Sequence, residues 1–186
     1  MKTIAIKDLM VPLEEYATVS EEATLFEAVS ALEKAQEIFV NDKYPYLHRA
    51  ILVYDKDNQI VGKISQLDVL RALEPKYGDL GDVRKMSYSG FSPQFLKTML
   101  QQGALWESPI RNICSKAGGF KVKTFMYTPT ENEYINEDAT LDEAIHLLVM
   151  GHHQSLLVTR GKEIIGILKL TDVFSEIFHI MKTCEV

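Results

Sequence analysis

Features that several functional classes need are missing from this sequence. Its two cysteines, Cys114 and Cys184, have no metal-ligand spacing and form no disulfide framework, so we expect reduced thiols. Uninterrupted apolar runs are only a few residues long, far short of the roughly 20 residues that a membrane-spanning helix requires. The first ten residues contain no basic region followed by a long apolar core, which predicts no signal peptide and, by default, a cytoplasmic protein.

Positive charge is also scarce. The 186 residues include 20 Lys and Arg against 26 Asp and Glu, which gives a formal net charge of −6. Because binding along a nucleic-acid backbone needs a basic face, this balance argues against nucleic acid as the main partner. Hydrophobic residues make up 46% of the chain and charged residues 25%, which is typical of a soluble globular protein.

The common catalytic and cofactor motifs are absent from the sequence as well. It contains no G-x-x-x-x-G-K-[ST], no G-x-G-x-x-G and no G-x-S-x-G. His146, His152 and His153 have no acidic or cysteine ligand at a fixed spacing, which disfavours a metal site and a histidine-based enzyme. We therefore predict no catalytic residue, no metal site and no required cofactor.

What the sequence does contain is an internal repeat. Residues 4–29 align with residues 120–145 at a constant offset of 116, without a gap. Nine of the 26 aligned positions are identical, far more than chance gives, so we infer a duplication. The identical pairs are Lys7/Lys123, Met10/Met126, Glu15/Glu131, Glu21/Glu137, Ala23/Ala139, Thr24/Thr140, Leu25/Leu141, Glu27/Glu143 and Ala28/Ala144.

The similarity resumes further along the chain. Residues 50–69 align with residues 155–173, at an offset that has fallen to 104 at Gly62 and Gly166. The first copy therefore contains an insertion, at about residues 37–49. We predict repeat 1 at residues 4–73, a connector at residues 74–119 and repeat 2 at residues 120–181.

Both repeats show the same order of local patterns. A short extended segment precedes a helix, for which Ser20 and Asn136 are the expected N-caps. Two short aliphatic runs follow around a tight turn, and a second helix opens near Asp68 or Asp172. The predicted order is strand, helix, strand, strand, helix, twice over, which is a mixed α/β (α+β) fold.

The connector is predicted to be largely helical. Ser92 and Pro93 form an expected helix start, and a structureless loop of this length is uncommon in a small protein. Apolar residues then fall on one side of the predicted helix: Phe95, Leu96, Met99, Leu100 and Leu105.

The duplicated unit, with a helix opened by A-T-L-x-E-A and a glycine six residues before an aspartate, resembles the CBS domain, named for cystathionine β-synthase. The resemblance covers both repeats and not the connector. It implies that the repeats pack by their sheets as a pseudo-two-fold pair, with two clefts that hold AMP, ADP, ATP or a related adenosyl ligand in many members. It also implies a non-catalytic regulatory role such as energy sensing, a homodimer, and a regulated protein partner that the sequence does not identify.

The resemblance also implies which residues line the clefts. Nucleotide-binding members have hydroxyls three and five residues after the glycine and an aspartate at six, and each repeat departs once, at Leu67 and Lys169. An ionised aspartate can accept both ribose hydroxyls, while a cation, hydroxyls and a helix N-terminus can hold phosphate. The other wall is implied to come from the partner repeat. The Asp172 cleft would use Lys169, Thr171 and Asp172 with Pro12, Ala17, Thr18, His48 and Arg49, with adenine against Ala17 and Thr18. The Asp68 cleft would use Ser65 and Asp68 with Thr128, Glu133, Tyr134 and His153, and the resemblance puts Arg49 near Asp68 as well.

A different interpretation stays open. Asp68 and Asp172 can be helix N-caps only, in a structural or dimerisation module whose vestigial clefts bind nothing and which acts through protein–protein contacts. Leu67 and Lys169 favour this alternative, whereas the presence of both aspartates favours nucleotide binding. For the homodimer we expect an interface on the Phe174/Ile177/Phe178 face of the last helix or on the Phe95/Met99 face of the connector.

Overall fold

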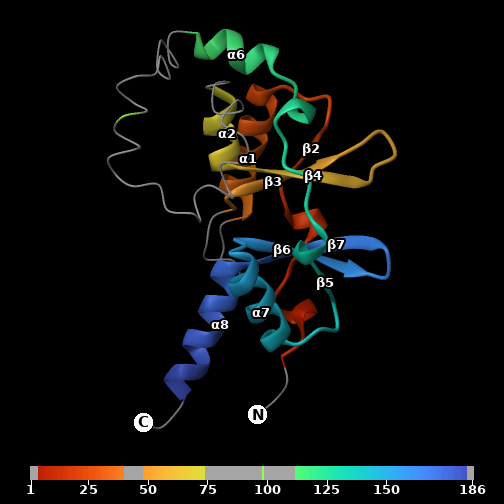
Figure 1. Ribbon diagram of the computed structural model, residues 1–186, viewed down its shortest axis with the longest axis vertical. Coiled ribbons are helices and arrows are strands. Elements are labelled where there is room, and N and C mark those ends of the chain that lie inside the picture. The colour runs from red at the N-terminus through yellow and green to blue at the C-terminus, as the bar shows by residue number, and fades with distance from the viewer. Residues whose placement is uncertain (1–3, 40–47, 74–97, 99–111, 184–186) are drawn as a thin grey trace.

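The computed structural model describes residues 4–39, 48–73, 98 and 112–183, and within them each repeat forms a small sheet with helices outside it (Figure 1). The first repeat runs β2 (Thr18–Ser20), α1 (Leu25–Phe39), β3 (Ala50–Tyr54), β4 (Ile60–Ser65) and α2 (Gln66–Leu73). The second repeat runs β5 (Tyr134–Asn136), α7 (Leu141–Gly151), β6 (Ser155–Arg160), β7 (Glu163–Lys169) and α8 (Leu170–Thr183). The predicted order of elements and the mixed fold class are confirmed in both repeats.

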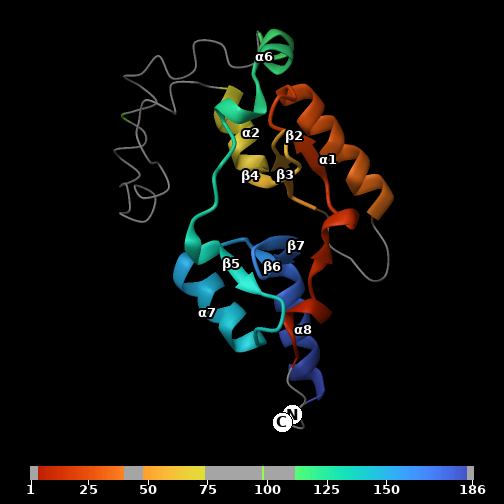
Figure 2. The ribbon, with the colours of Figure 1, turned by 90° about the vertical axis from the view of Figure 1, so that its right-hand side faces the viewer.

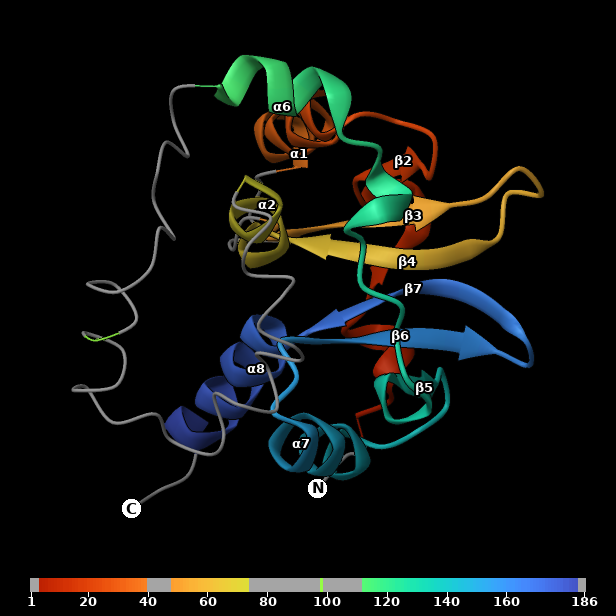
Figure 3. The same cartoon turned by 45° about the horizontal axis from the view of Figure 1, so that its top comes forward.

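The two sheets have the same topology and face each other. In each, a parallel pair (β2 with β3, β5 with β6) is joined by a crossover helix, and an antiparallel strand follows (β4, β7). Figure 3 shows the sheets one above the other, with α1 and α6 (Ile113–Gly119) above them and α7 below. Leu52 and Leu157, each at most 1% exposed, belong to one buried cluster at this boundary. The predicted pseudo-two-fold pair of repeats is therefore confirmed.

The repeats exchange the segments that lead into them, residues 4–12 and 120–128, which we call the lead segments. In the first, β1 (Val11–Pro12) pairs with β7 of the second repeat, and Ile6 in η1 (Ile6–Asp8) lies in the second repeat's core. Figure 2 shows this N-terminal segment running down beside the second repeat. The repeat pattern did not predict this exchange.

The second lead segment makes the reciprocal contacts. Val122, the aligned counterpart of Ile6, lies in η4 (Val122–Thr124) and is fully buried in the first repeat's core. Tyr127 and Lys63 then exchange two backbone hydrogen bonds of 2.9 Å, which extends the first sheet beyond β4. Each hydrophobic core therefore contains residues from both halves of the chain.

The exchange explains one of the identical pairs, Lys7/Lys123. Lys7 Nζ lies 2.8 Å from Asp138, and its aligned counterpart Lys123 lies 2.6 Å from Glu22. Both ion pairs are largely exposed, so each contributes little stability. They show that the two lead segments dock in the same way, each on the loop before the other repeat's first helix.

The helix caps differ from the prediction. Thr24 and Thr140 form capping boxes with Glu27 and Glu143, because each threonine lies three residues before a glutamate that reaches back to its N–H. Ser20, predicted as an N-cap, instead accepts a hydrogen bond from the Glu22 N–H in the preceding turn. Asn136 does the same for Asp138. Assigning Ser20 and Asn136 as the caps was therefore wrong by one turn.

The predicted insertion and connector are only partly described. The first three residues of the insertion, 37–39, continue α1, and residues 40–47 lie outside the described part. In the connector, α6 is helical, and Lys116 Nζ donates to the Leu73 carbonyl at the end of α2. The predicted apolar face at Phe95, Leu96, Met99, Leu100 and Leu105 also lies outside the described residues. None of the helices that the structure does describe is long and apolar enough to span a membrane.

Candidate functional site

The two aspartates that the sequence singled out lie at equivalent strand-to-helix junctions. Asp68 is in the first turn of α2, directly after β4, and its carboxylate accepts hydrogen bonds from the Ser65 N–H (2.9 Å) and hydroxyl (2.6 Å). The Ser65 hydroxyl in turn accepts from the Asp68 N–H at 3.3 Å. One Asp68 oxygen is therefore engaged in a capping box, and the other lies 3.6 Å from Arg71.

Asp172 has a different neighbour, because Lys169 stands where the first repeat has Ser65. Lys169 lies at the end of β7 and is 5% exposed, and its Nζ is 3.3 Å from Asp172 Oδ2. That oxygen is buried and makes no hydrogen bond within the described part of the chain. A lysine cannot accept the helix N–H as a serine does, so Asp172 is paired with a buried cation and forms no capping box with residue 169.

Two rings from the first repeat complete the surroundings of Asp172. Tyr16 is 5% exposed and His48 is 2% exposed, and their rings stack with centroids 4.5 Å apart and an interplanar angle of 18°. We call Tyr16, His48, Lys169 and Asp172 the Asp172 cluster. It joins the loop after η2 (Leu13–Glu15) and the start of β3 to the β7–α8 junction, so it bridges the repeats.

The charges of the Asp172 cluster influence one another. Burial, and next the negative charge of Asp172, raise the pKa of the Tyr16 hydroxyl. Burial, and next the positive charge of Lys169, lower the pKa of His48 to about 4, so this imidazole is neutral at pH 7. Burial also raises the pKa of Asp172, more than the nearby Lys169 lowers it. The cluster thus holds a partly desolvated carboxylate and a buried cation beside a neutral aromatic pair.

The corresponding region on the other side is built around Glu133, which is 1% exposed. Its carboxylate forms an ion pair with Lys63 of the first repeat and accepts hydrogen bonds from the Tyr127 hydroxyl and the Thr130 N–H. Burial raises the pKa of Glu133, but the hydrogen bonds from Lys63 and Tyr127 outweigh it, and the pKa lies below its usual value. We call Lys63, Tyr127, Thr130 and Glu133 the Glu133 cluster.

His153 lies beside the Glu133 cluster. It is the counterpart of His48. Val53 pairs with Gly62 and Val158 pairs with Gly166, and each histidine lies five residues before its valine. Its ring covers Gly151, where a Cβ would lie 2.0 Å from His153 Nε2. Burial lowers the pKa of His153, and Glu133 opposes this. Nε2 is buried without a hydrogen-bond partner in the described part of the chain.

The predicted site residues thus divide into those near a cluster and those apart from it. Lys169, Asp172 and His48 come together, and His153 lies close to Glu133. Ala17 faces the core of the first repeat, and its carbonyl accepts from the Leu52 N–H. Of the remaining residues, Thr18, Arg49 and Thr128 are exposed, and Pro12, Ser65, Tyr134 and Thr171 are half-buried.

Sequence reasoning missed Tyr16, Lys63 and Tyr127. Tyr16 directly precedes the predicted Ala17–Thr18 wall, so a scan for aromatic residues beside that wall could have found it. Lys63 and Tyr127 carried no local signal, because they meet only through the exchange of lead segments. A separate surface depression, lined by Asp142, Glu143, His146 and Leu147 on α7, contains none of the predicted ligand residues.

Comparison with known proteins identifies the fold family. The CBS domain family model matches residues 6–75 and 122–179, more than half of the chain. No curated protein matches the sequence.

Solved structures match over nearly the whole chain. The structure of CBSX2 in complex with AMP has 18% identity and a TM-score of 0.58, and covers 95% of this chain and 98% of its own. CBSX2 from Arabidopsis thaliana has 16% identity and a TM-score of 0.58, with 98% and 100% covered. A CBS domain-containing protein of unknown function from Bacillus anthracis has 16% identity and a TM-score of 0.61, with 95% and 94% covered. At these identities the likeness to solved structures concerns the fold alone. The family model, which matches more than half of the chain in two regions, shows that this chain belongs to the CBS domain family, as a tandem pair of CBS domains.

Proposed function

We propose that this chain is a non-catalytic regulatory module that binds an adenosine nucleotide (AMP, ADP or ATP) at the Asp172 cluster. The observation that carries the proposal is the buried Lys169–Asp172 pair at the β7–α8 junction, facing Tyr16 and His48 of the other repeat. A cation, a carboxylate and aromatic rings are the groups that phosphate, ribose and adenine require. The AMP complex of the structurally similar CBSX2 supports adenosine as the nucleoside.

Binding would exchange one set of ionic contacts for another. Without ligand, Lys169 neutralises the buried Asp172 carboxylate. With nucleotide bound, Lys169, Thr171 and the N-terminus of α8 would hold phosphate, and Asp172 would accept the ribose hydroxyls. Adenine would lie against Ala17 and Thr18, next to the Tyr16–His48 stack, with Arg49 at the exposed edge. Each ionic group keeps a partner in both states, which limits the cost of burial.

Such a ligand would act as a signal because it contacts both repeats. A ligand shifts the packing of the repeats only if it binds one arrangement more tightly than another. The nucleotide would join the β7–α8 junction to residues of the first repeat, and a protein partner would read the resulting arrangement. We propose energy sensing in the cytoplasm as the setting.

A second candidate is a dimerisation module in which nucleotide has no role. The observation that favours it is the exposed apolar face of α8, where Phe174, Phe178 and Met181 are 65%, 50% and 63% exposed, whereas Ile177 packs against the core of the second repeat. Residues spaced by three or four lie on one side of a helix, so these form a continuous surface suited to a second copy of the chain. A homodimer is compatible with both candidates, and nucleotide binding separates them.

Titration calorimetry with adenosine, AMP, ADP and ATP tests the proposal. Asp172→Ala removes hydrogen bonds to a charged acceptor, worth roughly 1.5–3 kcal/mol each, so affinity should fall about tenfold or more. Asp142→Ala is the matched control, because Asp142 is an exposed aspartate in the first turn of α7. Lys169→Ser, which introduces the residue found in the first repeat, should weaken ATP more than adenosine. If the parent binds none of these ligands at millimolar concentration, the dimerisation module is the better account.

A further inference from the structure

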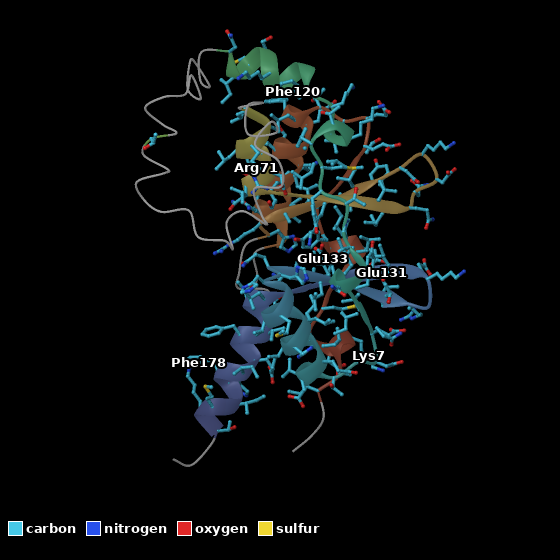
Figure 4. The ribbon with its side chains drawn as sticks, in the orientation of Figure 1. Lys7, Arg71, Phe120, Glu131, Glu133 and Phe178 are labelled. Carbon is cyan, nitrogen blue, oxygen red and sulfur yellow. The ribbon has the colours of Figure 1, made fainter. Side chains whose placement is uncertain are left out.

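The two halves of the inter-repeat boundary differ in charge. Glu133 is buried between the repeats, where Figure 4 labels it at the level between the two sheets. Its aligned counterpart in the first repeat is Ala17. The counterparts of Tyr127 and Lys63 are Val11 and Ile167, both 0% exposed in the apolar cluster at the boundary. One half is therefore joined by an ionic network and the other by apolar contacts.

The ionic network lies on the side where the Asp68 cleft is expected. Residues two apart on a strand point to the same face of a sheet, so Lys63 and Ser65 of β4 share one face. Glu133 pairs with Lys63 on that face. A phosphate placed at the N-terminus of α2, next to Ser65 and Asp68, would therefore approach two carboxylates that already hold the nearby cations: Arg71 lies 3.6 Å from Asp68, and Lys63 pairs with Glu133. On the other side, a phosphate at the N-terminus of α8 would meet Lys169.

Glu133 has little capacity to tolerate a competing anion. It is 1% exposed and accepts from Lys63, from the Tyr127 hydroxyl at 2.5 Å and from the Thr130 N–H at 3.2 Å. A phosphate that drew Lys63 away would leave a buried carboxylate without its cation. Breaking a buried ion pair in this way weakens binding by about 100-fold or more.

We propose that Glu133 excludes phosphate-bearing ligands from the Asp68 side, so that each chain binds one nucleotide, at the Asp172 cluster. Glu133 then takes the place of the ligand's phosphate, and its ion pair with Lys63 ties the two repeats together on that side permanently. Only the Asp172 side opens or closes with ligand. The identity of the nucleotide rests on the function proposed above, whereas the exclusion of anions by Glu133 does not.

The stoichiometry of AMP binding is the first measurement. Calorimetry on the parent should give one AMP per chain, and Asp172→Ala should bind AMP at least tenfold more weakly. Glu133→Gln in the Asp172→Ala background keeps the shape of the side chain and removes its charge, and it should restore one site. Two AMP molecules per parent chain of similar affinity would overturn the proposal, as would a Glu133→Gln variant that restores none.

Inorganic pyrophosphate provides a readout that needs no adenosine site. In the Asp172→Ala background, pyrophosphate should raise the melting temperature of the Glu133→Gln variant by several degrees more than that of the Glu133 form. Adding Lys63→Met should abolish the increase, because the anion would bind through Lys63. If Glu133→Gln produces no pyrophosphate-dependent increase, Glu133 is not the excluding group. If the increase is present but the parent binds no AMP, the proposed function fails and the exclusion stands.

Discussion

Replacing Gly166 by alanine would test the docking of the first lead segment, residues 4–12, on the second repeat. A Cβ at residue 166 would lie 2.5 Å from the Val11 carbonyl oxygen and 3.1 Å from Met10 Sδ. Val11 is fully buried and pairs with Ile167 in the β1–β7 ladder. The clash is with backbone, so β1 must move as a unit and cannot relieve it by a change of rotamer.

The expected cost follows from comparing three glycines. Overpacking a tight contact costs about 1–3 kcal/mol, and the backbone clash puts Gly166→Ala at the upper end of that range. At Gly62 the nearest atom is Met126 Sδ at 2.7 Å, the end of a flexible side chain, so Gly62→Ala should cost about 1 kcal/mol. At Gly118, in α6, a Cβ meets nothing within 4 Å, and Gly118→Ala should stabilise by up to about 1 kcal/mol.

Urea unfolding of the three variants, followed by circular dichroism, would measure the differences in free energy of unfolding. We expect the order Gly118→Ala, parent, Gly62→Ala, Gly166→Ala, from most to least stable. Even a mild clash should lower the free energy of unfolding by more than about 0.5 kcal/mol. A smaller difference between Gly166→Ala and the parent would show that Val11 does not lie against residue 166. The docking of the first lead segment on the second repeat would then be wrong.

Two further predictions concern pH and assembly. The pKa of His48 is about 4 in the folded protein and about 6.5 when unfolded, so its contribution to stability is complete above pH 6.5 and is lost as the pH falls toward 4. Substituting His48→Gln should flatten the dependence of the free energy of unfolding on pH between 7 and 4.5, and an unchanged slope would contradict the burial of a neutral imidazole. Phe178→Asp, on the exposed face of α8, should shift sedimentation from dimer to monomer while the circular dichroism spectrum stays that of the folded chain. Phe26→Asp, on the exposed surface of α1, is the control and should leave assembly unchanged, and a parent that is monomeric at tens of micromolar would exclude this interface.

The sequence predicts the architecture of each repeat well, because local patterns determine it. Short aliphatic runs, tight turns and the duplicated Gly62 and Gly166 are properties of neighbouring residues, and the structure confirms the order they predict. The capping error has the same origin. Several hydroxyl and amide side chains precede each helix, and only the threonine–glutamate spacing identifies Thr24 and Thr140 as the caps.

The exchange of lead segments could not be predicted from the repeat alone. Two similar copies offer chemically similar docking sites, so the pairing of Lys7 with Asp138 instead of Glu22 has no sequence signal. The Lys63–Glu133 pair is hidden for the same reason, since it joins residues 70 positions apart without a counterpart in the other half. Tyr16 was missed because the family pattern points to the residues after it.

The structure also separates the two aspartates that the sequence treated alike. Asp68 has the serine that completes a capping box, so its position is explained without a ligand. Asp172 has a buried lysine instead, which a capping role does not require. In the sequence, the departure from the family pattern at Lys169 favoured a vestigial cleft. In the structure, the same residue is the feature that best supports nucleotide binding.

A crystal structure of the chain grown with millimolar AMP would test the central proposal most directly. We predict one AMP per chain, with its ribose hydroxyls within hydrogen-bonding distance of the Asp172 carboxylate and its phosphate within reach of Lys169. The Lys63–Glu133 pair should stay closed, and no nucleotide should lie beside Asp68. Nucleotide bound beside Asp68 and not beside Asp172, or an intact Lys169–Asp172 pair with no nucleotide bound, would contradict the account.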